Sequence, residues 1–246
     1  MTTALITGGS RGLGRSMALH LAQQGVDVIF TYKAAKKEAA DVREQIVKLG
    51  RKATALPLDV ADTAGIAPFA KAVAAELKGG KLDYLINNAG TSLHASIAET
   101  TAAQLDEVYT VHFKSPFLLT QALLPLIADG GRILNVSSGL TRFAIPGSSA
   151  YAAMKGAVEV FTRYLAKELG DRKITANTIA PGAIETDFSG GMVRDNPEVN
   201  RMVRSMTALG RAGLPDDVGA AVAMLLGPGS GWMNGQRIEV SGGMLL

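Results

Sequence analysis

The chain contains 246 residues, of which 47% are hydrophobic and 19% are charged. A chain of this size and composition buries a large core of its own, which excludes an intrinsically disordered protein. The formal net charge is only +3 and the basic residues are scattered, so we expect no nucleic-acid partner. The absence of cysteine excludes disulfides, thiolate nucleophiles and cysteine-bound metal clusters. The three histidines lie far apart without metal-ligand spacing, so we expect no metal site.

We expect neither a targeting segment nor a membrane span. The N-terminal residues lead directly into an apolar segment, without a basic region or a small-residue cleavage site. The longest apolar stretch, residues 117–128, is interrupted by Thr120, Gln121 and Pro125, so it is too short to cross a membrane. A cytoplasmic location is therefore the default expectation.

Short apolar segments rich in β-branched residues alternate with helix-length segments along the whole chain. The predicted strands cover residues 4–7, 26–32, 53–57, 84–87, 132–137, 175–180 and 237–240. Helices are expected to begin after Gly14, near Lys36, Gly65 and Ala102, at Tyr151 and near Asp216. This alternation predicts an α/β fold, a doubly wound (Rossmann) parallel sheet of about seven strands with helices on both faces, in one domain over residues 1–246.

A glycine-rich turn joins the first predicted strand to the first predicted helix. Residues 7–14 read T-G-G-S-R-G-L-G. At this place in a βαβ unit, backbone N–H groups and the helix N-terminus are able to bind a pyrophosphate. The spacing differs from the common G-x-G-x-x-G, and an ordinary tight turn would explain the glycines alone. The position of the turn favours dinucleotide binding.

The residues after the second strand indicate which dinucleotide is bound. An NAD site has an acidic residue there for the ribose 2′-OH, whereas this chain reads Thr31-Tyr32-Lys33. Lys33 and Arg11, the latter inside the glycine turn, are able to converge on a 2′-phosphate. A solvated helix start is the alternative explanation for Lys33. The sequence therefore predicts NADP as cofactor.

Three further motifs follow in order: Asn87-Asn88-Ala89-Gly90 after the fourth strand, Ser138 after the fifth, and Tyr151-x-x-x-Lys155 at a helix start. With the glycine turn, this ordered set resembles the short-chain dehydrogenase/reductase family over essentially the whole chain. Within the family the chain is most similar to 3-oxoacyl-[acyl-carrier-protein] reductases and related NADPH-dependent ketoreductases. The cofactor-binding residues that we infer are Gly8, Ser10, Arg11, Gly12, Leu13, Gly14, Lys33, Asp59, Val60, Asn88, Ala89, Gly90, Tyr151, Lys155, Pro181, Gly182, Ile184 and Thr186.

Tyr151 and Lys155 are four residues apart, so they share one face of a helix. A neighbouring ammonium favours the tyrosinate and lowers the pKa of the tyrosine from its usual ~10. The resemblance implies that Tyr151 protonates the substrate carbonyl oxygen and that Lys155 also bonds the nicotinamide ribose. Ser138 would hold the substrate oxygen. Alone, the Tyr–Lys pair would be explained as an exposed helix pair and Ser138 as a turn cap, but the ordered set favours catalysis.

One position departs from the family pattern. Members usually carry Asn in a stretch like V-N-x-K-x-x-F, and residues 111–117 here read V-H-F-K-S-P-F, so His112 takes the place of the Asn. In the family that Asn holds a water of a proton relay from the lysine to solvent. Two interpretations stay open. Either His112 replaces the Asn in the relay, since imidazole titrates near neutral pH, or it is a neutral helix residue and the relay is slower or rerouted. We favour the first as a hypothesis.

The resemblance also implies a substrate lid at about residues 186–210, hinged at Gly190-Gly191. Four apolar residues inside the lid have helical spacing: Val199, Met202, Val203 and Met206. This apolar stripe packs the lid against the rest of the protein, forms a Met-lined pocket for an apolar substrate, or does both.

The sequence gives a mixed signal for an acyl-carrier-protein partner. Reductases of carrier-bound substrates tend to show basic residues near the active-site entrance, and Asp129 stands where a base would be expected. Arg172 and Lys173 keep half of such a patch, although a solvated helix C-terminus explains them equally well.

The helix from Tyr151 carries more apolar surface than one sheet face needs. The resemblance implies that the excess forms an interface with the helix at residues 113–126, in a homotetramer of D₂ symmetry. The C-terminal residues 244–246 are candidates for another interface.

The sequence therefore predicts an NADPH-dependent reductase that converts a small-molecule ketone or 3-oxoacyl carbonyl to a secondary alcohol. One alternative is the 3-oxoacyl-[acyl-carrier-protein] reductase of fatty acid synthesis itself. Another, of a different class, is a non-catalytic NADP(H)-binding sensor or scaffold, which the intact Ser138, Tyr151 and Lys155 disfavour. A serine hydrolase is poorly supported, because the chain has no G-x-S-x-G elbow.

Overall fold

The computed structural model describes residues 2–246. Seven parallel strands form one sheet in the order β3-β2-β1-β4-β5-β6-β7. The strands are β1 (Thr3–Ile6), β2 (Asp27–Tyr32), β3 (Ala53–Pro57), β4 (Leu82–Asn87), β5 (Ile127–Val136), β6 (Thr175–Pro181) and β7 (Arg237–Val240). The predicted doubly wound α/β fold is confirmed.

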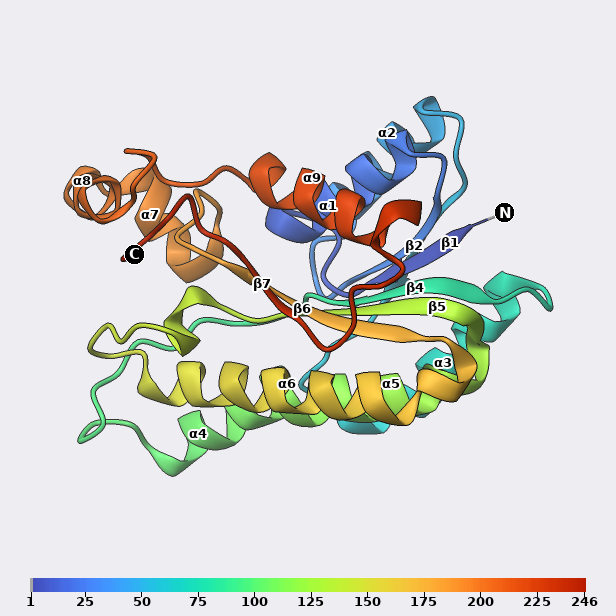
Figure 1. The fold of residues 1–246 in the computed structure, drawn as a ribbon, viewed down its shortest axis with the longest axis horizontal. Coiled ribbons are helices and arrows are strands. Elements are labelled where there is room, and N and C mark those ends of the chain that lie inside the picture. Colours follow the sequence, from blue (N-terminus) through green and yellow to red (C-terminus); the bar gives the residue numbers. More distant parts are fainter. Residues whose placement is uncertain (1) are drawn as a thin grey trace.

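Helices cover both faces of this sheet (Figure 1). One face carries α1 (Gly12–Gln23), α2 (Lys36–Lys48) and α9 (Pro215–Leu226). The other carries α3 (Ile66–Leu77), α4 (Ala102–Tyr109), α5 (Ser115–Leu123) and α6 (Ser149–Glu168). The helices α7 (Met192–Asp195) and α8 (Pro197–Met206) lie together at one end of the molecule, beside the C-terminus.

Each helical layer is held to the sheet by its own apolar cluster. Met17, Ile46 and Val222 are fully buried in the cluster under α1, α2 and α9. Leu85 and Leu123 are fully buried in the cluster on the opposite face. Because both faces are covered, the strands are continuous apolar segments rather than alternating ones. The two clusters fix the strands, so the loops at their carboxyl ends are left to form a site.

The predicted elements lie where expected, with differences at their ends. Strands β3 and β7 have the predicted bounds, whereas β4 begins at Leu82 and β5 at Ile127, before the predicted residues 84 and 132. The β4–β5 register shifts between Leu82 and Tyr84, so residues 128–131 form a bulge between the paired residues Ile127 and Arg132, with the φ angle of Gly130 at 79°. The predicted helix at 113–126 begins in a π turn, Thr110–Lys114, and ends in a 3₁₀ turn, Leu124–Leu126. Among the residues that the structure describes, no helix is both long and apolar enough to span a membrane.

A buried ladder of side-chain hydrogen bonds crosses the centre of the fold. The Asn87 amide donates to the hydroxyl of Thr120 at 3.0 Å and to the carbonyl of Asn135 at 2.8 Å. Asn135 in turn donates to the hydroxyl of Thr162 at 2.8 Å. All four side chains are buried, so the ladder joins β4, β5, α5 and α6 without contact with water. It sets the position of α6 relative to β5.

Replacing Asn135 by leucine tests this ladder. Asn135→Leu keeps the side-chain size but removes a donor and an acceptor, and we expect the free energy of unfolding to fall by about 1–3 kcal/mol. Urea unfolding measures it. Gln23→Leu, at the exposed end of α1, is the control, with a change within about 0.5 kcal/mol. Equal unfolding midpoints for the two variants would contradict a stabilising role of the ladder.

Candidate active site

The carboxyl ends of the central strands open into a cavity of about 830 Å³. All the residues predicted for cofactor binding or catalysis line it, from the glycine turn at Gly8 through Asn88, His112, Ser138 and Tyr151 to residues near Thr186. The structure thus brings every predicted site residue to one cavity, although they come from separate parts of the chain. Their individual roles stay predictions.

The glycine turn forms the floor of one end of this cavity. Gly8 and Gly12 have φ angles of 69° and 53°, which side-chain-bearing residues rarely adopt. The Thr7 hydroxyl oxygen accepts hydrogen bonds from the backbone N–H groups of Asn88 and Ala89, each at 2.9 Å. The Asn88 amide donates back to the Thr7 carbonyl at 2.8 Å. The segment after β4 therefore holds the turn rigid, and the start of α1 lies open to a bound pyrophosphate, so the residues fit a dinucleotide.

Lys33 and Arg11 lie at the end of the cavity where the 2′-phosphate was predicted. The Lys33 ammonium forms an ion pair with the Asp59 carboxylate at 2.8 Å, and this contact lowers the pKa of Asp59. The sequence did not indicate the pair, because the two residues are 26 positions apart on neighbouring strand ends. Arg11 is exposed at the start of α1. It is therefore the better placed of the two cations for an added phosphate.

Ser138, Tyr151 and Lys155 meet at the carboxyl end of β5. Lys155 is only 5% exposed, and its ammonium donates to the carbonyl oxygen of Val136 at 2.7 Å. The ammonium lies 5.6 Å from the centre of the Tyr151 ring. Ser138 is the second residue after β5, and its side chain lies close enough to the Tyr151 hydroxyl to act on the pKa of that tyrosine. The spacing of four residues therefore puts both α6 side chains toward Ser138, as the sequence predicts.

The predicted lowering of the tyrosine pKa is wrong for the residues of this chain. Burial raises the pKa of Tyr151 to about 12, and the hydrogen bond with Ser138 opposes this rise only partly. Burial also lowers the pKa of Lys155 to about 8. The reason is physical, since removing a charged form from water shifts both groups toward their neutral forms. At neutral pH Tyr151 thus keeps its proton, and Lys155 is still largely charged.

His112 lies beside Tyr151, in the π turn. The two rings are 5.0 Å apart and almost perpendicular, and His112 is 2% exposed. Its Nε2 is 2.9 Å from the carbonyl oxygen of Thr91, which places the ring proton on Nε2. The buried Nδ1 has no hydrogen-bond partner among the described residues. Burial and the charge of Lys155 lower the pKa of His112 to about 3, so the hypothesis of titration near neutral pH is wrong.

Comparisons with known proteins identify the family. A family model described as "Enoyl-(Acyl carrier protein) reductase" matches residues 8–245. The chain belongs to the short-chain dehydrogenase/reductase family. The hydroxynaphthalene reductase-like protein Arp2 of Metarhizium brunneum is 34% identical, over 98% of this chain and 93% of its own. The chain is thus an oxidoreductase of this family.

Two solved structures of this family have nearly the same fold. LugOII, a promiscuous reductase that catalyses keto-reduction at C1 during lugdunomycin biosynthesis, has a TM-score of 0.94 and 37% identity, covering 100% of this chain and 98% of its own. The angucycline C-6 ketoreductase LanV, solved with bound NADP, has a TM-score of 0.93 and 35% identity. The LanV match covers 99% of this chain and 95% of LanV.

In this short-chain dehydrogenase/reductase the substrate end of the cavity is apolar. Its lining includes Phe143, Ile145, Phe188 and Met244, none of which the sequence assigned to a substrate pocket. They lie in loops and at the C-terminus, where no periodic pattern marks them. The ring of Phe188 lies 6.2 Å from that of Tyr151. A flat apolar molecule in this part of the cavity would therefore contact aromatic groups next to Tyr151.

The structure does not form the Met-lined pocket expected from α8. Val203 is buried, whereas Met202 is 49% exposed, and the described lining of the cavity contains neither of them. Of these two residues of the apolar stripe, Val203 therefore packs α8 against the rest of the protein, and Met202 does not. The expectation of a C-terminal interface is wrong for Met244, because this residue is buried within its own chain and lines the cavity. For Leu245 and Leu246, which are exposed, it stays a prediction.

Replacing Gly14 by alanine tests the glycine turn. A Cβ at Gly14 would overlap the carbonyl oxygen of Gly8 and lie 2.7 Å from the amide nitrogen of Asn88. We expect Gly14→Ala to lower the free energy of unfolding by about 1–3 kcal/mol and to weaken dinucleotide binding. Gly229→Ala is the control, because a Cβ there has no atom within 4 Å. Denaturant unfolding and cofactor titration measure the two effects, and equal values in both variants would contradict the predicted overlap.

Proposed function

We propose that this protein is an NADPH-dependent ketoreductase that converts a ketone to a secondary alcohol, with Tyr151 as general acid. The observation that carries the proposal is the meeting of Ser138, Tyr151 and Lys155 with the glycine turn in one cavity. LanV with bound NADP and the keto-reducing LugOII, both similar over nearly the whole chain, support it.

The chain's own residues would hold the cofactor and the substrate oxygen. NADPH supplies a hydride when bound. The glycine turn and the start of α1 would bind the pyrophosphate, Arg11 and Lys33 the 2′-phosphate, and Lys155 the nicotinamide ribose. Ser138 would donate a hydrogen bond to the substrate carbonyl oxygen and keep it within reach of Tyr151.

The pKa values in the site favour proton donation. With a pKa of about 12, Tyr151 enters the reaction protonated at neutral pH. As the carbonyl oxygen becomes an alkoxide, Tyr151 transfers its proton to it, and the Lys155 ammonium stabilises the tyrosinate left behind. His112 would take part as a neutral group, with Nδ1 accepting a hydrogen bond from a donor in the cavity.

The apolar lining favours a bulky aromatic ketone as substrate. Phe143, Phe188 and Met244 lie on the substrate side, and the name of the similar Arp2 refers to an aromatic substrate, hydroxynaphthalene. The alternative of a carrier-bound 3-oxoacyl substrate has less support. Arg172 is ion-paired with Asp129 at 2.8 Å and donates to the carbonyl of Leu124, so it is engaged within the chain.

We also propose a homotetramer and a mobile lid. Apolar side chains on α5 and α6 remain exposed within one chain, including Phe117 at 39% and Tyr164 at 63%. Phe117 and Phe161 stack at 4.7 Å, which presents a flat aromatic surface to another copy. For the lid at about residues 186–210, Gly190 and Gly191 have φ angles of 66° and 78° and are able to act as hinges.

The first experiment separates the enzyme from a cofactor-binding sensor. Loss of reduced-nicotinamide absorbance is followed with NADPH and with NADH, using 2-tetralone as an aromatic ketone and a 3-oxoacyl thioester. We expect turnover with NADPH and 2-tetralone, and a loss of at least about 100-fold in kcat in Tyr151→Phe, because the proton donor is removed. NADPH binding, measured by titration, should persist in that variant.

Tyr84→Phe, in the middle of β4, is the control and should keep full activity. Tight NADPH binding without turnover of any ketone would favour the sensor. A clear preference for the thioester would favour the acyl-carrier-protein reductase.

The pH dependence tests the state of His112. With a pKa of about 3, His112 is neutral throughout the range from about pH 5.5 to 7.5, so we expect a flat rate of reduction there. The rate should fall above pH 8, because Lys155, with a pKa of about 8, then loses the charge that stabilises the tyrosinate. His112→Asn should keep this profile.

His112→Phe keeps the ring but removes the Nδ1 acceptor, and we expect about a 10-fold lower kcat if that acceptor takes part in proton transfer. A change of rate with an apparent pKa near 6.5 in the parent protein, absent in His112→Asn, would instead support the hypothesis that His112 titrates in a proton relay. Full activity of His112→Phe would remove His112 from the proposed chemistry.

A further inference from the structure

A third polar residue lies on the catalytic face of α6. Tyr151, Lys155 and Glu159 are each four positions apart, so one helix face presents all three toward the end of β5. The Glu159 side chain is only 14% exposed. One of its carboxylate oxygens, Oε1, accepts hydrogen bonds from Ser137 at 2.6 Å, Thr141 at 2.7 Å and Arg237 at 2.9 Å.

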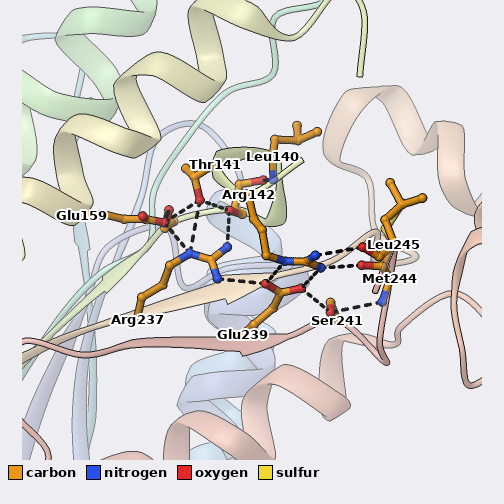
Figure 2. A network of polar contacts seen from close by, with 11 residues as sticks. Leu140, Thr141, Arg142, Glu159, Arg237, Glu239, Ser241, Met244 and Leu245 are labelled. Atoms are coloured by element: carbon orange, nitrogen blue, oxygen red, sulfur yellow. Dashed lines mark hydrogen bonds and ion pairs between the residues drawn. The ribbon is translucent and has the colours of Figure 1, made fainter. Parts of the chain in front are cut away.

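These bonds hold the chain on both sides of Ser138. Figure 2 shows the bonds of Glu159 with Thr141 and Arg237. Ser137 precedes Ser138 directly, and Thr141 closes the 3₁₀ turn Gly139–Thr141 that follows it. Arg237, from β7, also donates through Nη2 to the carbonyl oxygen of Ser138 at 3.2 Å. The carboxylate of Glu159 and the guanidinium of Arg237 thus fix the loop that carries the Ser138 hydroxyl.

We propose that Glu159, paired with Arg237, is a positioning residue that sets the Ser138 hydroxyl against the Tyr151 hydroxyl. The proposal rests on the catalytic roles of Ser138 and Tyr151 in the proposed function. Tyr151 lies on a rigid helix and Ser138 on a loop, so the distance between their hydroxyl groups depends on the contacts that join the loop to the helix. Glu159 ties it to the same helix that carries Tyr151. A misplacement of about 1 Å in such a site is able to cost on the order of 100-fold in rate.

The same network extends to the C-terminal segment. Arg237 also pairs with Glu239 at 2.9 Å, and Glu239 pairs with Arg142 at 2.7 Å. Arg142 donates to the carbonyl oxygens of Met244 at 2.6 Å and Leu245 at 2.9 Å. Figure 2 shows the two arginines and two glutamates alternating from Glu159 to this segment. Since Met244 lines the cavity, the loop of Ser138 and the substrate wall share one support.

The network contributes geometry more than stability. Taking ion pairs out of water has a desolvation cost that largely cancels their attraction, so a well-packed apolar replacement would stabilise the fold as well. Three directional bonds to a single oxygen, in contrast, define the position of each donor. We therefore expect the loss of Glu159 to appear mainly in catalysis.

Glu159→Gln tests the proposal, because it keeps the size of the side chain and removes the charge. We expect kcat to fall about 10- to 100-fold while the Kd for NADPH stays unchanged, since neither residue of the pair touches the cofactor turn. Asp27→Asn is the matched control. Asp27 Oδ1 likewise accepts three bonds, from Nε and Nη2 of Arg51 and from the N–H of Lys52, at the opposite end of the sheet. It should lose similar stability and keep kcat.

A double-mutant cycle with Ser138→Ala decides whether Glu159 acts through Ser138. If it does, Ser138→Ala/Glu159→Gln has the kcat of Ser138→Ala alone. Two results would overturn the positioning role and leave the proposed function intact. The first is a kcat of the double variant that is lowered by the product of the two single losses. The second is full kcat in Glu159→Gln when Ser138→Ala is slow. Full kcat in Ser138→Ala would overturn the proposed role of Ser138 and this inference together.

Should Glu159→Gln fail to fold, Thr141→Val removes one of the three bonds, together with the 2.9 Å bond from the Thr141 hydroxyl to the Ser138 carbonyl oxygen, and leaves the ion pair with Arg237. We expect a smaller drop in kcat, about 3- to 10-fold, with the same non-additivity toward Ser138→Ala. Unchanged kcat in Thr141→Val would overturn the proposal in that case.

Discussion

A buried lysine ammonium joins α6 to the central sheet. Lys155 donates to the carbonyl of Val136 at the end of β5 and is almost fully removed from water. Burial and, to a smaller extent, the charge of Lys155 lower the pKa of His112, and the same ammonium faces the ring of Tyr151. The position of α6 and the electrostatics beside both rings therefore depend on this one group, and in the proposed reaction it would also stabilise a tyrosinate. The ladder through Asn135 supports it by fixing the same helix to the same strand.

The fold was predictable because strands that are buried on both faces of a parallel sheet are continuous apolar segments, which the sequence shows directly. Strand β7 lies between the polar residues Gln236 and Ser241, whereas β3 begins after Lys52 and ends at Pro57, and the predicted ends of both strands are those observed. The start of β5 was not predictable, since Asp129, Gly130 and Gly131 have the composition of a loop. They form a bulge, with the φ angle of Gly130 at 79°, between Ile127 and Arg132, which pair with Leu82 and Tyr84 of β4, and this pairing is a tertiary contact. Local composition carries no information about that contact.

The residues of the candidate site were predictable where they form ordered motifs. Properties that depend on the packed surroundings of a residue, such as its pKa or its ion-pair partner, were not. Spacing places Tyr151 and Lys155 on one face, but the pKa of each follows from burial, which depends on the whole packed structure. The partner of Lys33 and the apolar wall at Phe143 and Phe188 arise from loops that meet only in space. Glu159 is different, because its spacing of four from Lys155 was a visible signal.

In the proposed reaction, the raised pKa of Tyr151 has a consequence for the timing of proton transfer. A tyrosine that holds its proton at neutral pH is a poor base toward an alcohol, yet it is a ready donor to an alkoxide, which is the stronger base. Donation becomes favourable only as negative charge develops on the substrate oxygen, so proton transfer follows or accompanies hydride arrival. The apolar wall strengthens this order by excluding water that would otherwise protonate the oxygen or solvate Lys155. In the proposed reaction, Tyr151 would thus already hold at neutral pH the proton that reduction requires.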